Sequence, residues 1–308
     1  MGWLTVVEPG MLTTVQDLGR PGHTSLGVPV GGAADPLALR AGNRLVGNSD
    51  GAAGLECTLT GPTLLFEQDA AVALTGAANP IGEPAWWARV SMRAGERLRV
   101  GPVSGGARAY VTVAGGLCVP PVLGSASTLL SAGFGGHLGR ALKAGDRLEF
   151  VDAPVRSRGT RMVEDLHRQY IRQAGLRILR AVDGPHSQAF DRTATDAFWS
   201  ATFKISNHSN RTGVRLDGPV FSTLIQGDMA SEGMPPGAVQ ITPNGQPIVL
   251  GPDHPTTGGY PVIACVATVD AHLLGQARPG ETLRFERVTV QQARAALIDR
   301  EREWNEQP

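Results

Sequence analysis

The stretch GPDHPTTGGYPVIACVA, at Gly251–Ala267, places a carboxylate, an imidazole and three hydroxyl groups directly before an apolar run. An acid and an imidazole can take a proton from a small amide, and hydroxyl groups can orient that amide. The glycines beside them let a ligand approach backbone N–H groups. We therefore predict acid/base roles for Asp253, His254 and the upstream Glu232. We predict substrate-orienting roles for Thr256, Thr257 and Tyr260.

Three further polar clusters lie in TVQDLGRPGHTSLGVPVGGAADP, VDGPHSQAF and SNHSNRTGVRLDGP. Their arginines could clamp a carboxylate or a phosphate through two parallel hydrogen bonds. A structural explanation is open for each cluster, since such residues also cap helices and close polar turns. The remaining candidate substrate-binding residues are Gln16, Asp17, Arg20, Asn43, His186, Asn210, Arg211 and Arg215.

Several kinds of site lack their sequence signature. The seven histidines form no HxxxH or HExxH pair, and Asp270 with His272 lacks a third metal ligand, so we expect no metal site. Neither Lys143 nor Lys204 follows a Gly-x-x-x-x-Gly run, which argues against a Walker-type phosphate loop. Neither lysine is flanked by methionines, so no biotin is expected on this chain. The Gly-x-Ser-x-Gly nucleophile elbow is also absent.

The charge composition argues against two classes of partner. Among 308 residues, Lys and Arg number 28, as do Asp and Glu, so the net charge is zero and neither nucleic acid nor a membrane surface is an expected partner. Charged residues make up 18%, against roughly 25% in an average domain. A surface so poor in charge suggests cover by another protein chain. Three cysteines in apolar settings and no 18-residue apolar stretch predict a cytoplasmic protein.

The elements that must position these residues read mostly as short strands with a period of two, separated by Gly and Pro. A helix is predicted after Asp35, with Pro36 in its first turn and Gly47 past its end. Two more helices are predicted near 188–200 and from Val290 onward. The predicted strands are 97–100, 109–114, 146–150, 176–182, 247–251 and 282–288.

The chain also repeats. Residues 95–114 and 245–264 align without a gap at an offset of 150, and they share Gly, Gly-Pro, Tyr and Ala. We predict a mainly β, β-rich α+β fold made of two β-barrel halves from an internal duplication. The predicted organisation is a first half at 1–155, a linker or connecting helix at 156–175, and a second half with a C-terminal helix at 176–308.

Two regions differ between the repeated halves. The first half carries a long Gly/Ser-rich loop at 117–136, which we predict to act as a lid or as a contact with another protein chain. The second half has DHPTTGG where the first has VSGGARA. Because the repeated scaffold does not require these polar residues, they are better candidates for function than for folding.

Taken in order, the polar clusters resemble the family of allophanate hydrolase subunit 2, which includes the C component of 5-oxoprolinase. The same module is similar to the A/B part of the carboxyltransferase domain of urea carboxylase, and to an antagonist of a sporulation kinase inhibitor. Ala34 and Thr212 stand where the family usually has methionine. The resemblance covers nearly the whole chain, through TVQDLGRPGH, GVPVGGAADPLALRAGNRLVGN, GPH, SNRTGVRLDGP, SEGMPPGAVQ and DHPTTGGYP.

This resemblance implies two cyclophilin-like barrel halves and a partner, the B component, which is similar to allophanate hydrolase subunit 1. With the A and B components, the expected reaction converts 5-oxo-L-proline, ATP (with Mg) and water to L-glutamate, ADP and phosphate. ATP would then bind at an unusual site, Arg-based and shared with the B component. The alternatives are a carboxyltransferase component of a biotin-dependent urea or amide carboxylase, and a regulatory antagonist of a kinase inhibitor.

Overall fold

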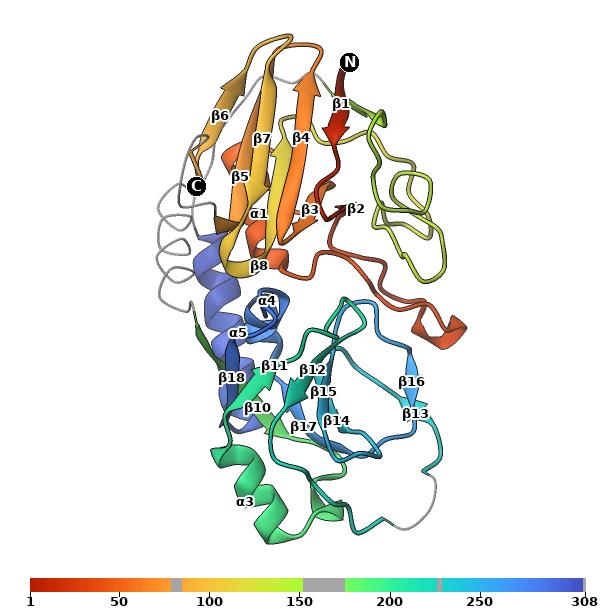
Figure 1. Ribbon diagram of the computed structural model, residues 1–308, viewed down its shortest axis with the longest axis vertical. Helices are drawn as coiled ribbons and strands as arrows, with labels where there is room; N and C mark the ends of the chain where they lie inside the picture. Colours follow the sequence, from red (N-terminus) through yellow and green to blue (C-terminus); the bar gives the residue numbers. More distant parts are fainter. Residues whose placement is uncertain (79–84, 152–174, 226–228, 307–308) are drawn as a thin grey trace. The chain divides into compact units, whose positions relative to one another are not determined.

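The computed structural model describes residues 1–78, 85–151, 175–225 and 229–306 (Figure 1). They divide into two compact units. Residues 1–20 and 31–151 belong to the first unit, while residues 21–30 join residues 175–306 in the second. The first unit is therefore built from two stretches of chain, whereas the boundaries expected from the sequence were continuous. The predicted linker, apart from Gly175, lies outside the described residues.

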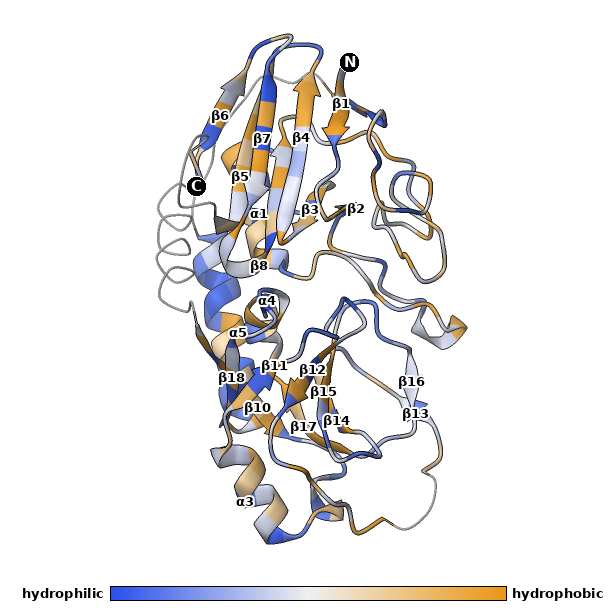
Figure 2. Ribbon diagram, viewed as in Figure 1, coloured by the Kyte–Doolittle hydropathy of each residue, from blue (hydrophilic) through white to orange (hydrophobic). Residues whose placement is uncertain are grey.

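The first unit contains two antiparallel sheets, one of four strands and one of five. The four-stranded sheet has the order β7 (Arg97–Pro102), β4 (Thr60–Phe66), β1 (Gly2–Glu8) and β9 (Arg147–Phe150). The five-stranded sheet has the order β2 (Leu12–Gln16), β3 (Gly54–Thr58), β8 (Ser104–Val113), β5 (Ala70–Ala78) and β6 (Arg89–Met92). In β1 alternate residues are buried, as expected for a strand with one face on the core. Apolar side chains of both sheets, such as Leu4, Phe66, Leu55 and Val111, form one hydrophobic core. Figure 2 shows hydrophobic and hydrophilic residues alternating along β7.

Helix α1 (Pro36–Leu45) packs on β5 and β8. The Asp35 side chain accepts a 3.0 Å hydrogen bond from the Ala38 backbone N–H, and Pro36 occupies the first helical position. Gly47 follows the helix with a φ of 78°, a conformation that glycine adopts without strain. The prediction of this helix is confirmed.

The second unit contains a closed barrel of seven strands. Phe198, Phe203, Phe221 and Phe285 cluster in its core, with the rings of Phe198 and Phe285 stacked 5.0 Å apart. A separate two-stranded sheet pairs β13 (Glu232–Gly233) with β16 (Thr257–Gly258). The barrel order is β10 (Leu176–Asp183), β17 (Val262–Val266), β14 (Ala238–Ile241), β15 (Pro247–Leu250), β12 (Gly213–Asp217), β11 (Phe203–Ile205) and β18 (Thr282–Arg287).

Short helices complete the second unit. The helical elements of this unit are η1 (Thr24–Leu26), η2 (Ser187–Ala189), α3 (Arg192–Ser200), η3 (Thr268–Asp270), α4 (Ala271–Gly275) and α5 (Val290–Asn305). The C-terminal helix α5 begins with a reciprocal cap, in which Thr289 and Gln292 each bind the other's backbone N–H. None of the helices among the described residues is long and apolar enough to cross a membrane.

The mainly β prediction is confirmed, and the predicted strands and helices recur within a few residues of their expected positions. The repeated halves are less alike than the sequence suggests. The last strand of the first unit, β9, runs antiparallel to β1, whereas β18 of the second unit runs parallel to β10. The barrel closes in the second unit, and the strands of the first form the two sheets described above.

Candidate functional site

The two-stranded sheet of the second unit brings two predicted segments together. Glu232 lies directly opposite Gly258, and Gly233 lies opposite Thr257. One residue further along, the Met234 backbone N–H donates a 2.9 Å hydrogen bond to the Thr256 carbonyl. Glu232 is thereby fixed beside the DHPTTGGYP motif from which the other acid/base candidates come.

His186 reaches the same place from the loop after β10. Its backbone N–H donates to the Val262 carbonyl at 3.1 Å, and its Nδ1 accepts from the Val262 backbone N–H at 3.2 Å. The opposite ring nitrogen, Nε2, lies 3.5 Å from Glu232 Oε2. The His186 side chain is 17% exposed and that of Glu232 is 54% exposed. The arrangement is thus an imidazole–carboxylate pair open to a ligand.

Asp253 has a different environment. Arg211 holds it through two parallel bonds, Nε to Oδ2 at 2.7 Å and Nη2 to Oδ1 at 2.8 Å, and both side chains are only 6% exposed. The Asp253 backbone N–H also donates to the Arg211 carbonyl at 3.2 Å. The structure therefore joins a predicted acid/base residue to a predicted anion clamp, and each satisfies the other.

His254 is buried next to this pair. Its Nδ1 lies 2.6 Å from the Pro255 carbonyl, which as an acceptor requires the proton on Nδ1. Burial lowers the pKa of His254, so the ring is held in its neutral form. A neutral buried ring with one nitrogen engaged has only Nε2 left for proton transfer.

The remaining candidates of the second unit lie on turns and strand ends. Asn210 Oδ1 accepts from the Thr212 and Gly213 backbone N–H groups and so closes a polar turn, the structural explanation left open above. Arg215 and Thr257 are exposed, and Thr256 is half-buried. Tyr260 is 43% exposed, and its carbonyl accepts from Gln240 Nε2 at 3.3 Å.

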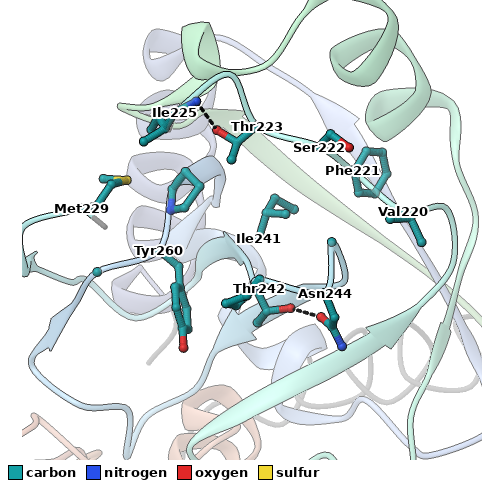
Figure 3. A pocket seen from close by; sticks show the side chains of 14 residues that line it. Val220, Phe221, Ser222, Thr223, Ile225, Met229, Ile241, Thr242, Asn244 and Tyr260 are labelled. Carbon is teal, nitrogen blue, oxygen red and sulfur yellow. Dashed lines mark hydrogen bonds between the residues drawn. The ribbon is translucent and has the colours of Figure 1, made fainter. Parts of the chain in front are cut away.

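Tyr260 also lines a cavity of about 670 Å³ (Figure 3). Its described lining is uncharged and largely apolar, and Phe221, Ile241 and Met229 are among its apolar residues. Thr242 donates to Asn244 Oδ1 at 2.5 Å on one side of the cavity. Sequence reasoning missed the cavity residues because apolar side chains are not distinctive until the fold gathers them around a space.

In the first unit, Asp17 and Arg20 hold the long Gly/Ser-rich loop. Asp17 accepts hydrogen bonds from Ser125 Oγ at 2.6 Å, Ser127 Oγ at 2.5 Å and the Ala126 backbone N–H at 2.7 Å. Arg20 is 1% exposed and donates to the Ser127 and Val122 carbonyls. A loop held in this way could open as a lid only by breaking these bonds. A contact with another protein chain through this loop remains a prediction.

Gln16 and Asn43 are also fully buried. Gln16 Nε2 donates to the Thr128 carbonyl at 3.1 Å, while Oε1 has no hydrogen-bond partner among the described residues. Asn43 Nδ2 donates to the Ala52 carbonyl at 2.8 Å and Oδ1 accepts from Asn48 at 3.1 Å, which shapes the turn after α1. The predicted residues of the first unit thus bind mainly the protein's own backbone.

A buried cluster at the start of α1 was not predicted. Glu56 Oε2 accepts from Tyr110 Oη at 2.7 Å and from the Ala34 backbone N–H at 2.8 Å. Glu56 Oε1 lies 3.3 Å from Arg108 Nε. Burial first, and then the Glu56 charge, raises the pKa of Tyr110 well above its ordinary value. Sequence reasoning missed this cluster because Glu56 lies on β3 and its partners Arg108 and Tyr110 lie on β8, about 50 residues further along the chain.

The predictions about metal and nucleotide binding can be examined at the same residues. Within the described ranges, no three His, Cys, Asp or Glu side chains are grouped to hold a metal ion. Asp270 is engaged by Arg180, and His272 lies 3.2 Å from Arg300 Nη1, a neighbour that disfavours a second cation. Lys143 and Lys204 are both exposed. ATP, with Mg, stays a proposal, and we derive no step through it.

The family model "carboxyltransferase domain, subdomain A and B" matches residues 26–287. The chain belongs to this family. It is 43% identical over 305 residues to the C component of 5-oxoprolinase from Escherichia coli strain K12, covering 97% of this chain and 96% of that protein. The corresponding 5-oxoprolinase component of Haemophilus influenzae is 38% identical over 298 residues, covering 94% and 93%.

A solved structure in the family extends the comparison to the fold. The urea carboxylase of Kluyveromyces lactis superposes with a TM-score of 0.85 at 29% identity. The match covers 95% of this chain but 28% of that much longer chain. In that carboxylase, the fold described above is one part of a larger polypeptide.

Proposed function

We propose that this chain is the C component of a multi-subunit, ATP-dependent 5-oxoprolinase, a hydrolase acting on a cyclic amide. With the A and B components, the enzyme converts 5-oxo-L-proline to L-glutamate. The observation that carries this proposal is the end-to-end match to the E. coli protein, with more than nine tenths of both chains aligned. The similarity to carboxylases covers only a segment of those proteins.

The proposal makes activity depend on partners. A sequence with only 18% charged residues favours a surface covered by another chain, which would complete the reaction. The B component, which is similar to allophanate hydrolase subunit 1, is the proposed direct partner, and the A component joins for the full reaction. ATP, with Mg, is in this scheme a substrate of the assembly.

The second candidate is a carboxyltransferase that moves CO2 from biotin to urea or a related amide. The superposition on K. lactis urea carboxylase favours it. Both candidates require the same elementary ability, which is to hold a small amide and move a proton on its nitrogen. They differ in the activating partner: a phosphoryl donor in the first case and a carboxylated biotin carrier in the second.

The test is release of glutamate from 5-oxoproline by this chain co-purified with its B component, with the A component and Mg-ATP added. We expect glutamate to form only when ATP and all three chains are present. A complex that is intact by size-exclusion chromatography and yet releases none would overturn the proposal. In that case, transfer from carboxylated biotin to urea by the same preparation would support the second candidate.

A further inference from the structure

We propose that Glu232 is the residue of this chain that removes and returns the amide proton, and that His186 is its positioning residue. This inference rests on the proposed function for its substrate, a small cyclic amide. Of the three predicted acid/base residues, Glu232 alone has a half-exposed side chain facing an imidazole. Asp253 and His254 are buried and engaged by neighbours.

The backbone around Val262 fixes both the position and the tautomer of His186. The His186 main chain donates to the Val262 carbonyl, and the Val262 N–H donates to Nδ1. Because Nδ1 accepts that hydrogen bond, the proton of the neutral ring must be on Nε2. Nε2 is the atom that lies 3.5 Å from Glu232 Oε2. The ring therefore presents a donor to the carboxylate, and contacts of this kind often shorten when substrate binds.

The backbone of Glu232 is fixed by strand pairing, while its carboxylate is exposed. Its strand pairs with Gly258, whose missing side chain leaves room for Gln240. A Cβ added at Gly258 would lie 2.6 Å from Gln240 Nε2, so the absence of a side chain there is part of the site's shape. With Oε2 next to His186, Oε1 has no hydrogen-bond partner among the described residues and can face a ligand.

The chain segments that carry β13 and β16 also contribute residues to the cavity lining. Met229 lies three residues before Glu232, and Gly259 with Tyr260 directly follows Gly258. An uncharged, mainly apolar wall suits the methylene face of a small cyclic amide. The amide N–H would then point toward Glu232 at the edge of the cavity.

In the proposed step, a proton moves from the substrate nitrogen to Glu232 and back. Glu232 Oε1 forms an O–H bond as the substrate N–H bond breaks, and the N–H electron pair stays on the amide, delocalised toward the carbonyl oxygen. His186 Nε2–H faces Oε2 throughout, at 3.5 Å in the structure. When water adds to the carbonyl carbon and the ring C–N bond breaks, Glu232 returns its proton to the nitrogen, the water supplies the second amine hydrogen, and the water oxygen stays on the carbonyl carbon. The carboxylate is regenerated and the product amine has both its hydrogens.

The experiment uses the assembled complex with Glu232→Gln, His186→Ala and His186→Gln variants. General acid/base catalysis contributes about 10² to 10⁴-fold, so Glu232→Gln should lower kcat by that factor with little change in KM. His186→Ala should lower kcat less and alter the pH profile, and His186→Gln should recover part of the loss because its amide can donate to Glu232. Asp196→Asn, which breaks an exposed ion pair with Arg192, is the matched control.

A second measurement separates this inference from the proposed function. Exchange of the lactam N–H of 5-oxoproline with water is followed by NMR with the complex and without ATP, and urea is the second probe. Wild type and Asp196→Asn should accelerate exchange of the bound amide, and Glu232→Gln should not. Normal turnover by Glu232→Gln would overturn the inference and leave the function standing. If glutamate release fails in wild type, Glu232-dependent exchange with urea still supports the pair, and its absence with both probes overturns it.

Discussion

Tyr110 and Tyr260 occupy equivalent positions in the two repeated segments, yet their environments are opposite. Tyr110 is fully buried and bonded to Glu56, whereas Tyr260 is 43% exposed and lines the cavity. The first tyrosine lies in β8, a central strand that pairs with β3 and β5 on its two sides. The second lies just before β17, between two short strands.

The cause of the difference is visible in the sequence. Pro261 follows Tyr260 where Val111 follows Tyr110, and Pro255 replaces Gly105. Proline has no N–H to donate to a strand ladder, so the second copy cannot remain one continuous strand. At the interruption Thr257 and Tyr260 are exposed, while Asp253 and His254 stay buried beside Arg211. The candidate site lies in the copy of the repeat whose strand is interrupted, and the other copy keeps a continuous strand.

The largest expected effect comes from Asp253→Asn. This change leaves the Arg211 charge buried without its partner, which typically costs about 3–5 kcal/mol of unfolding free energy. Urea denaturation followed by circular dichroism measures it. Asp253→Leu combined with Arg211→Met should recover most of the loss. Unchanged stability together with abolished glutamate release would instead favour the acid/base role predicted for Asp253.

Replacing the two tyrosines tests the comparison directly. Tyr110→Phe removes the hydroxyl that donates to Glu56 and accepts from the Asp35 backbone N–H, so it should cost about 1–3 kcal/mol of unfolding free energy. Tyr260→Phe should change stability by less than about 0.5 kcal/mol, because its hydroxyl group is on an exposed side chain. Equal effects in thermal unfolding would show that the two environments do not differ in energy.

Gly258 and Gly233 provide a matched pair within the interrupted segment. A methyl group at Gly258 meets Gln240 Nε2 at 2.6 Å, whereas one at Gly233 meets nothing within 4 Å. We expect Gly258→Ala to cost about 1–2 kcal/mol through overpacking, and Gly233→Ala to be nearly neutral. Denaturant midpoints measure both. A neutral Gly258→Ala would mean that Gln240 moves aside freely.

The smallest effect is an alkaline loss of stability centred on the first unit. Burial raises the pKa of Cys57 to about 12, and that of Tyr110 is also raised. Above about pH 9 the unfolded chain releases the thiol proton while the folded state retains it, so stability falls as pH rises from 9 toward 12. At pH 9.5 the loss from Cys57 is about 1 kcal/mol. Urea denaturation of Cys57→Ala should show a correspondingly flatter pH dependence.

Local features of the fold were predictable because their causes are local. Asp35 and Pro36 mark the start of α1 within two residues of chain, and alternation of charged and apolar residues identifies strands such as β7. The pairing of Arg211 with Asp253 depends on how β12 meets the chain after β15, 42 residues away. The charges of Arg211 and Asp253 indicate that each side chain needs an oppositely charged partner when buried. Only the topology of the fold brings these two side chains together.

For the candidate site, the sequence indicated which residues to consider but not which role each has. Glu232, His186 and Tyr260 could be singled out because small polar groups beside glycines are unusual at a strand end. Their roles could not be ranked, since exposure separates Glu232 from Asp253 and exposure is a property of packing. Arg20 and Asp17 illustrate the converse, because a charged side chain that binds its own backbone has the same sequence signature as one that binds a ligand.

Residues 21–30 belong to the second unit although the chain on both sides of them belongs to the first. During synthesis this segment leaves the ribosome about 145 residues before the rest of its unit, which resumes at Gly175. The first unit can assemble its sheets early, but the segment must wait for the barrel, and such long-range closure slows folding. Expressing the second unit from Gly175 alone would omit it. A circularly permuted chain in which residues 21–30 are close in sequence to the barrel residues would shorten that delay.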